Sequence, residues 1–131
     1  MQNSKAAKTI INPQGSAPAV GPYSHGVRAG DFLFCSGQIP LDPATGSLVS
    51  GDIKAQTSRV LENIKVILED QRLSFAHVLK TTVYLTDLAD FAGMNEVYAA
   101  YFTRDFPARS TVQVGALPKG AKVEIEVIAH A

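Results

Sequence analysis

The chain has 131 residues, 46% of them hydrophobic, which suits one globular domain and excludes both a disordered chain and two domains of ordinary size. Twelve Lys and Arg residues balance twelve Asp and Glu residues, so the chain lacks the positive charge typical of proteins that bind nucleic acid or anionic lipid. The single cysteine, Cys35, cannot form an internal disulfide. We expect neither a membrane span nor a secretory signal, and predict one cytoplasmic domain over residues 1–131, with residues 1–9 as a loose N-terminal extension and no metal site.

The first part of the chain is predicted to be extended, because short apolar segments there are separated by Gly and Pro. We expect an edge strand, a loop and two further strands at residues 10–13, 16–22, 23–28 and 32–39. Gly30 and Asp31 supply a tight turn between the last two strands, since Gly tolerates the positive φ of hairpin turns. A second turn is predicted over residues 42–46, where Pro43 presets φ and Gly46 closes the turn.

Two segments have the apolar spacing of amphipathic helices. The first stripe consists of Val60, Leu61, Ile64, Ile67 and Leu68, and the second of Phe91, Met94, Val97, Tyr98, Tyr101 and Phe102. Asp52 is expected to cap the first helix, because its carboxylate can accept from the free amides of the first turn. Asp87 is expected to cap the second helix, with Asp90 at the third helical position, and Pro107 follows where a helix cannot resume.

The remaining strands are predicted over residues 78–85, 110–114 and 122–129, with a bend at residues 117–120 between the last two. A strand–helix–strand crossover makes parallel neighbours, so this order of elements indicates an α+β domain. We therefore predict one mixed β-sheet with two helices packed on one of its faces.

The face of the sheet without helices is expected to need its own cover. Side chains alternate along a strand, so Phe32 and Phe34 point opposite to Leu33 and Cys35. Strands that are apolar on both sides require cover on both sides. We expect a second copy of the chain to supply it, and a long N-terminal segment folded across that face is the alternative.

We predict that the last two strands form a hairpin. If their apolar side chains lie on one common face, the register of the pairing is fixed to within its parity. This pairing puts five polar residues together on the opposite face: Arg109, Thr111, Gln113, Glu124 and Glu126. If Gln113 lies opposite Glu124, Arg109 is four residues along the strand, or about 13 Å away at about 3.3 Å per residue. The face is either a solvated surface with ordinary charges or, if a second copy covers it, an interfacial site where a buried guanidinium needs an anionic partner.

Five short motifs, taken together and in this order, carry a resemblance to a known family. They are Gly21–Ser24, Ser36–Ile39, Lys80–Leu85, Phe106–Ser110 and Leu117–Glu126. The set resembles the reactive intermediate deaminases of the RidA or YjgF family. The resemblance implies a chorismate-mutase-like fold and a homotrimer with clefts between subunits. It also implies a 2-iminobutanoate/2-iminopropanoate deaminase, which hydrolyses imines and enamines such as 2-aminoacrylate to 2-oxo acids and ammonia without a cofactor or metal.

The resemblance also assigns site residues. Arg109 is similar to the arginine that binds the substrate carboxylate, and Glu124 is similar to the glutamate that positions or activates water. Four further residues match positions that close around the ligand: Tyr23, Ser36, Gly37 and Asn95. Thr111 lines the same cleft and stands where many members have cysteine, and His25 stands where glutamine is common.

Two other functions are compatible with the same residues. One is a non-catalytic trimer that senses small carboxylates, because an arginine that binds an anion is the same in a sensor and in an enzyme. The other is the endoribonuclease or translation-inhibitor role attached to some relatives. The zero net charge and the absence of a basic stripe argue against nucleic acid as a partner.

Overall fold

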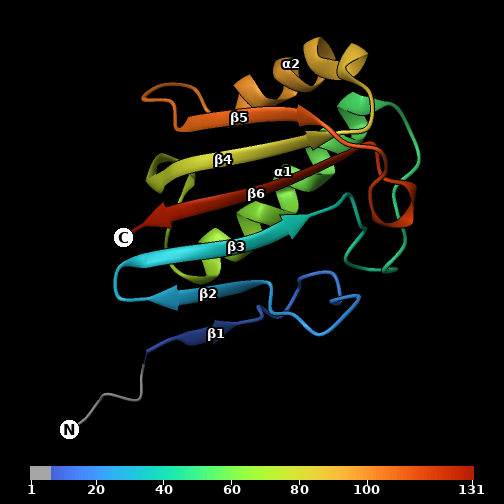
Figure 1. Cartoon of the computed structure of the whole chain (residues 1–131). Coiled ribbons are helices and arrows are strands. Elements are labelled where there is room, and N and C mark those ends of the chain that lie inside the picture. The colour runs from blue at the N-terminus through green and yellow to red at the C-terminus, as the bar shows by residue number, and fades with distance from the viewer. Residues whose placement is uncertain (1–6) are drawn as a thin grey trace, which may run out of the picture.

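Six strands form one mixed sheet, and two helices cover one of its faces (Figure 1). The computed structural model describes residues 7–131. Its strands and helices are, in chain order, β1 (Thr9–Ile11), β2 (Gly26–Ala29), β3 (Phe32–Gln38), α1 (Ile53–Asp70), β4 (Val78–Leu85), α2 (Phe91–Tyr101), β5 (Ala108–Gln113) and β6 (Val123–His130). The strands lie side by side in the order β1-β2-β3-β6-β4-β5, and only the β4–β5 pair is parallel. The predicted α+β class with a mixed sheet is confirmed.

The N-terminal part of the fold extends the sheet at one edge. Residues 1–6 of the expected extension lie outside the described residues, and Thr9 already belongs to β1, which pairs antiparallel with β2. β1 therefore lies beside the sheet and not across its open face (Figure 1). The next two strands form the predicted hairpin, with Gly30 at a φ of 58° in its turn.

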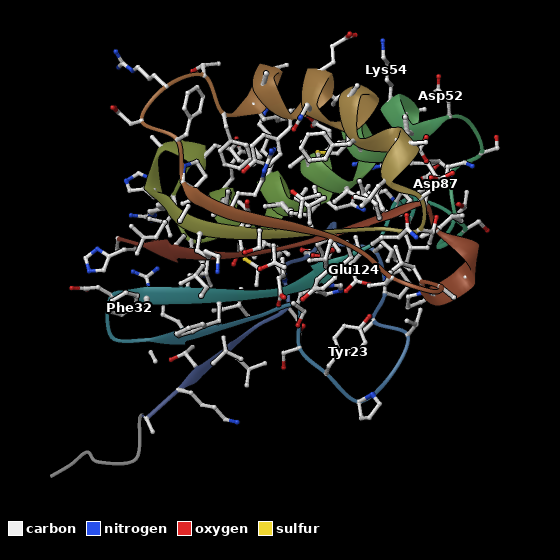
Figure 2. The ribbon with its side chains drawn as sticks, turned by 45° about the horizontal axis from the view of Figure 1, so that its top comes forward. Tyr23, Phe32, Asp52, Lys54, Asp87 and Glu124 are labelled. Atoms are coloured by element: carbon white, nitrogen blue, oxygen red, sulfur yellow. The ribbon has the colours of Figure 1, made fainter. Side chains whose placement is uncertain are left out.

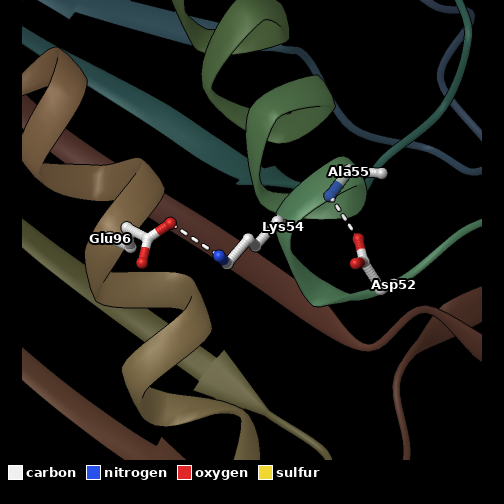
Figure 3. A network of polar contacts seen from close by, with 4 residues as sticks. All are labelled: Asp52, Lys54, Ala55 and Glu96. Atoms are coloured by element: carbon white, nitrogen blue, oxygen red, sulfur yellow. Dashed lines mark hydrogen bonds and ion pairs between the residues drawn. The ribbon is translucent and has the colours of Figure 1, made fainter.

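The two helices begin differently from one another. The Asp52 carboxylate accepts a hydrogen bond of 3.0 Å from the backbone N–H of Ala55 at the start of α1, as predicted (Figure 3). The Asp87 carboxylate instead accepts from Ala89 and caps a separate 3-10 turn over Leu88–Asp90. The prediction that Asp87 caps α2 is therefore wrong: the N-cap of α2 is Asp90, whose side chain makes no capping hydrogen bond.

The core lies between α1 and the central strands of the sheet. The predicted stripe of α1 is fully buried, with an exposure of 0% at Val60, Leu61, Ile64, Ile67 and Leu68. These residues pack against alternate residues of β3, β4 and β6, and each such side chain contributes about 1.5–3 kcal/mol on burial. Lys54 of α1 and Glu96 of α2 form an ion pair of 2.6 Å across the helices (Figure 3), although exposed pairs of this kind stabilise a fold little.

The predicted hairpin between the last two strands is wrong. β6 lies between β3 and β4, and β5 pairs in parallel with the other edge of β4. The reason is the crossover through α2, which places β5 next to β4 and leaves only the inner edge of β4 for β6. The polar residues therefore separate: Arg109 is level with the buried Thr81 on the helix side, whereas Glu124 is level with Tyr84 on the open side. The prediction that all five share one face is wrong for the same reason.

The open face of the sheet carries exposed apolar side chains, as predicted. Phe32 and Phe34 are 42% and 45% exposed, and Val112 of β5 is 43% exposed. No helix of the described residues lies on this side of the sheet (Figure 1). The domain thus has one face packed by α1 and α2 and a second face with exposed apolar side chains that no α-helix within residues 7–131 covers.

Candidate functional site

One groove of about 390 Å³ lies on the open side of the sheet and contains a carboxylate. Its lining includes Tyr23 from the loop before β2, Ser36 and Gly37 from the end of β3, and Glu124 and Glu126 from β6. Figure 2 shows Tyr23 and Glu124 toward the same end of the sheet, with Phe32 at the opposite end. We call this hollow the glutamate groove.

Gly37 makes room for the carboxylate of Glu124. The pairing of β3 with β6 is irregular between Cys35 and Gln38, so Gly37 lies within a bulge. A Cβ atom at this position would collide with Oε2 of Glu124. A larger residue at position 37 would therefore force the Glu124 side chain to move away from its present position.

The wall of the glutamate groove is fixed by backbone hydrogen bonds. The Ser36 hydroxyl donates to the carbonyl of Ser24 at 2.5 Å, and the Ser36 N–H donates to the carbonyl of His25 at 2.9 Å. These bonds join β3 to the loop that carries Tyr23. His25 is buried behind this loop, where its ring bonds the Ala17 carbonyl at 2.6 Å, and it is not among the residues that line the groove.

Burial and a second acid change the proton affinity of Glu124. Desolvation is the main reason that the pKa of this carboxyl lies above its ordinary value, and the nearby charge of Glu126 raises the pKa further. A carboxylate of this kind is a better proton acceptor than a fully solvated one, because its conjugate acid is weaker. Among the residues that line the glutamate groove, Glu124 therefore has a raised affinity for a proton.

A second groove, of about 410 Å³, lies on the helix side between β5 and α2. It is lined by Asn95, Tyr98, Ala99, Phe102, Phe106, Pro107 and Arg109. We call it the arginine groove. Its walls are mostly aromatic and aliphatic, so Arg109 and Asn95 are the groups in it that can bind a polar ligand.

The guanidinium of Arg109 is oriented without a carboxylate partner. Its Nη1 donates to Oδ1 of Asn95 at 2.7 Å, and its central carbon lies 4.8 Å from the ring centroid of Tyr98 and 5.5 Å from that of Phe91. Within residues 7–131, Arg109 forms no ion pair. Its remaining N–H groups can therefore bind a carboxylate bidentately, which a lysine could not do.

The structure brings the predicted site residues together in two sets. Tyr23, Ser36, Gly37 and Glu124 line the glutamate groove, and Asn95 and Arg109 line the arginine groove. Thr111 lines neither groove, although its Oγ1 is buried without a hydrogen-bond partner. Because the two grooves lie on opposite sides of the sheet, one protomer cannot present Arg109 and Glu124 to the same small molecule. The expected spacing of about 13 Å along one face is thereby replaced by a separation through the sheet.

Sequence reasoning missed the groups that support the two charges. Tyr98 lies three residues after Asn95 on α2, and this helical spacing could have indicated the ring beneath Arg109. Tyr84, which is level with Glu124 on the neighbouring strand, donates its hydroxyl to Glu126 at 2.6 Å. That contact depends on the position of β6 beside β4, which the sequence did not predict.

Other features add no further chemistry to the site. Within residues 7–131, no group of three or more His, Cys, Asp or Glu side chains could hold a metal ion. Burial raises the pKa of the Cys35 thiol to about 12, so this cysteine stays neutral.

Across the same described range, every helix is too short or too polar to span a bilayer.

Known proteins match this chain over most of its length. The family described as Endoribonuclease L-PSP matches residues 14–131. Proteins named 2-iminobutanoate/2-iminopropanoate deaminase are 48% identical in Salmonella typhimurium (94% of this chain, 97% of that protein) and 42% identical in Homo sapiens (96% and 92%). The crystal structure of E. coli TdcF with bound serine has a TM-score of 0.89 and 45% identity, and the match covers 94% of this chain and 98% of that one.

Proposed function

The chain belongs to the RidA/YjgF family, described as Endoribonuclease L-PSP, and from this we propose that it is a deaminase of 2-imino acids and their enamine tautomers. The substrates would be small molecules such as 2-iminobutanoate, 2-iminopropanoate and 2-aminoacrylate, and the products would be 2-oxo acids and ammonia. The observation that carries the proposal is the pair of open grooves, one with an anion-binding guanidinium and the other with a proton-accepting carboxylate.

The complete site would form between copies of the chain. We propose a homotrimer in which the arginine groove of one protomer faces the glutamate groove of the next. The exposed residues Phe32, Phe34 and Val112 support this assembly, because an uncovered apolar face favours association. The edge strand β5 supports it as well, since Arg109 lies on it and is itself exposed.

The proposed binding step uses the free donors of Arg109. Asn95 occupies one N–H of the guanidinium, so other N–H groups remain for the two oxygens of a substrate carboxylate. The rings of Tyr98 and Phe91 fix the plane of the guanidinium before the substrate arrives. Binding would therefore fix the orientation of the imine carbon relative to the neighbouring protomer.

The proposed chemical step uses Glu124 as a general base and then as a general acid. The protonated imine carbon is already electrophilic, so the Glu124 carboxylate needs only to take a proton from water as the water oxygen bonds to that carbon. The carbinolamine that forms then receives this proton on nitrogen. Glu124 then takes the hydroxyl proton as the C–N bond breaks and the C=O bond forms, and it passes this proton to the departing ammonia. The products are the 2-oxo acid and an ammonium ion. Tyr23 and Ser36 would hold the substrate within the groove.

A sensor of small carboxylates is the alternative function, because Arg109 would bind the same anions without turnover. The two functions differ in whether Glu124 is needed for a reaction or only lines the groove. Nucleic acid is a weaker candidate ligand, since the zero net charge provides no general attraction for phosphate.

The test is the rate of 2-aminoacrylate loss and ammonia release when a pyridoxal-phosphate dehydratase generates this enamine with and without the protein. We expect the wild type to accelerate the reaction and Arg109→Ala to lower kcat/KM by about 10²-fold or more. Arg104→Ala removes an arginine that lines neither groove and serves as the matched control. Equal rates with and without wild-type protein, combined with carboxylate binding that Arg109→Ala abolishes, would indicate the sensor instead.

A further inference from the structure

A second carboxylate, Glu126, lies in the glutamate groove beside the proposed base. Residues 124 and 126 project from the same side of β6, because side chains alternate along a strand. Both glutamates are half-buried, and within residues 7–131 neither forms an ion pair. Two like charges are thus held in one hollow, and this is unfavourable unless one of them is stabilised by another group.

Tyr84 stabilises the charge of Glu126, and within residues 7–131 no equivalent donor bonds the side chain of Glu124. The Tyr84 hydroxyl donates to Oε1 of Glu126 at 2.6 Å. A hydrogen bond to the ionised form of a carboxylate favours that form. The same bond is the main reason that the pKa of Tyr84 is raised, with burial and the two glutamate charges acting in the same direction. The tyrosine therefore remains a donor at neutral pH.

We propose that Glu126, held by the Tyr84 hydroxyl, is a positioning residue whose fixed negative charge makes Glu124 the proton acceptor of the pair. The inference rests on the proposed deaminase function, in which Glu124 takes a proton from water. Glu126 touches no reacting atom in this scheme. It acts through Glu124, since a nearby negative charge strengthens the affinity of a carboxylate for a proton.

Several other groups lie close to Glu124 on the neighbouring elements. β4 contributes Tyr84, the loop before β2 contributes Tyr23, and β3 contributes Ser36 and Gly37. In the proposed trimer, Arg109 of a neighbouring copy would also face the groove and would favour the ionised form of Glu124. Glu126 is the one group among these that acts in the opposite direction by charge.

The experiment measures the titration of Glu124 in two independent ways. The first is the acid limb of the pH profile of kcat/KM for wild type, Glu126→Gln and Tyr84→Phe. The second is direct titration of the side-chain carboxyl by carbon NMR in glutamate-labelled protein, with Glu124→Gln used to assign the signal. We expect Glu126→Gln to move both transitions about one pH unit lower, and Tyr84→Phe to move them lower by less, because the charge remains but is no longer fixed.

A second Tyr–Glu pair provides the matched control. The Tyr101 hydroxyl donates to Oε2 of Glu62 at 2.7 Å, and neither residue lines the arginine groove or the glutamate groove. Glu62→Gln and Tyr101→Phe should leave the Glu124 transition unchanged. A Glu124 signal that titrates at the same pH in wild type, Glu126→Gln and Tyr84→Phe would overturn the inference.

The two proposals fail in different ways. If the NMR transition moves in Glu126→Gln but no variant, wild type included, shows turnover, the charge coupling stands and the deaminase function is lost. If turnover is present and neither transition moves in the folded variants, the function stands and the role of Glu126 is lost. Circular dichroism and thermal unfolding identify the folded variants, and Tyr84→Phe tests the same contact if Glu126→Gln does not fold.

Discussion

The arginine groove and the glutamate groove hold opposite charges by different means. Arg109 lies on an edge strand, exposed, and is oriented by a neutral amide and two aromatic rings. Glu124 lies on a central strand, half-buried, and is surrounded by a glycine, hydroxyl groups and another acid. Within residues 7–131, neither charge has a counter-ion, although each has a defined position. Each charge therefore remains able to bind a group of opposite charge from outside the protomer.

The position in the sheet accounts for much of this difference. β6 is paired on both sides, by β3 and β4, so the backbone at Glu124 is fixed within one chain. Within residues 7–131, β5 pairs with β4 alone, and no strand of this range pairs with its outer edge. Arg109 therefore depends on its side-chain contacts with α2 for a defined orientation. The following predictions test whether the two grooves also differ in their contribution to catalysis.

The largest effect is expected from removing the proposed base. Glu124→Gln keeps the shape of the side chain but cannot accept a proton, so kcat should fall about 10²- to 10⁴-fold with little change in KM. Arg109→Ala should instead raise KM strongly, because it removes the anchor for the substrate carboxylate. Steady-state kinetics of both variants test this contrast. A Glu124→Gln variant that changes KM alone would show that the two grooves do not have separate roles.

Mixing the two inactive variants tests whether a site is shared between copies. In a mixed trimer of Arg109→Ala and Glu124→Gln chains, an intact Arg109 can face an intact Glu124 across some interfaces. Random assembly should restore about a quarter of the wild-type sites. The measurement is activity after joint refolding, compared with each variant refolded alone. No recovery from verified mixed oligomers would mean that both groups act within one protomer.

A smaller loss is expected when Gly37 gains a side chain. Gly37→Ala should displace the Glu124 carboxylate, lower kcat by about tenfold and destabilise the fold by about 1–3 kcal/mol. Gly115→Ala is the control, because a Cβ at that glycine meets no atom within 4 Å. Kinetics and denaturant unfolding of both variants give the two quantities. Equal behaviour of the two alanine variants would contradict the close approach described here.

A modest effect is expected from removing the amide that orients Arg109. Asn95→Ala should raise KM about three- to tenfold, since the guanidinium keeps its aromatic contacts but loses one hydrogen bond. The KM values of Asn95→Ala and Arg109→Ala are compared in steady-state assays, at substrate concentrations high enough to measure the activity of Arg109→Ala. A loss as large as that of Arg109→Ala would indicate that Asn95 itself binds the substrate.

The smallest effect concerns stability and its dependence on pH. The pKa of Glu124 is raised in the folded state, so folding favours its protonated form and the free energy of unfolding falls as pH rises past the ordinary value of a glutamate. Glu124→Gln should therefore be slightly more stable than wild type at pH 7, and this difference should disappear below pH about 4. Denaturant unfolding at several pH values tests the trend, and Arg109→Ala should show no such gain.

Much of the fold could be predicted from the sequence, because local patterns were sufficient for it. The stripe of α1, the cap at Asp52 and the turn at Gly30 each depend on residues close in the chain. The pairing of the last strands could not be predicted in the same way. The alternating apolar residues of β6 fit against β4 and β3 as well as against β5, and alternation indicates which side chains share a face but not which strand lies beside them.

The candidate site residues were named from the family resemblance, and their arrangement was not predicted. Tyr23, Ser36, Gly37 and Glu124 line one groove, and Asn95 and Arg109 line another. The two grooves lie on opposite sides of the sheet because of the order of the strands. Their separation could therefore not be predicted before that order was known. The aromatic rings beneath Arg109 and the bond from Tyr84 to Glu126 likewise depend on elements distant in sequence.

The central position of β6 also has a consequence for synthesis of the protein. β6 follows all other described strands in chain order, yet it joins β3 to β4. During synthesis, at about 5–20 residues per second, β3 and β4 lack the strand that pairs with their inner edges in the folded sheet until β6 has been made. The nascent chain would therefore be open to aggregation or chaperone binding until residues 123–130 emerge. Deleting β6 would divide the sheet between β3 and β4, whereas deleting β1 would remove one edge strand and leave the other pairings in place.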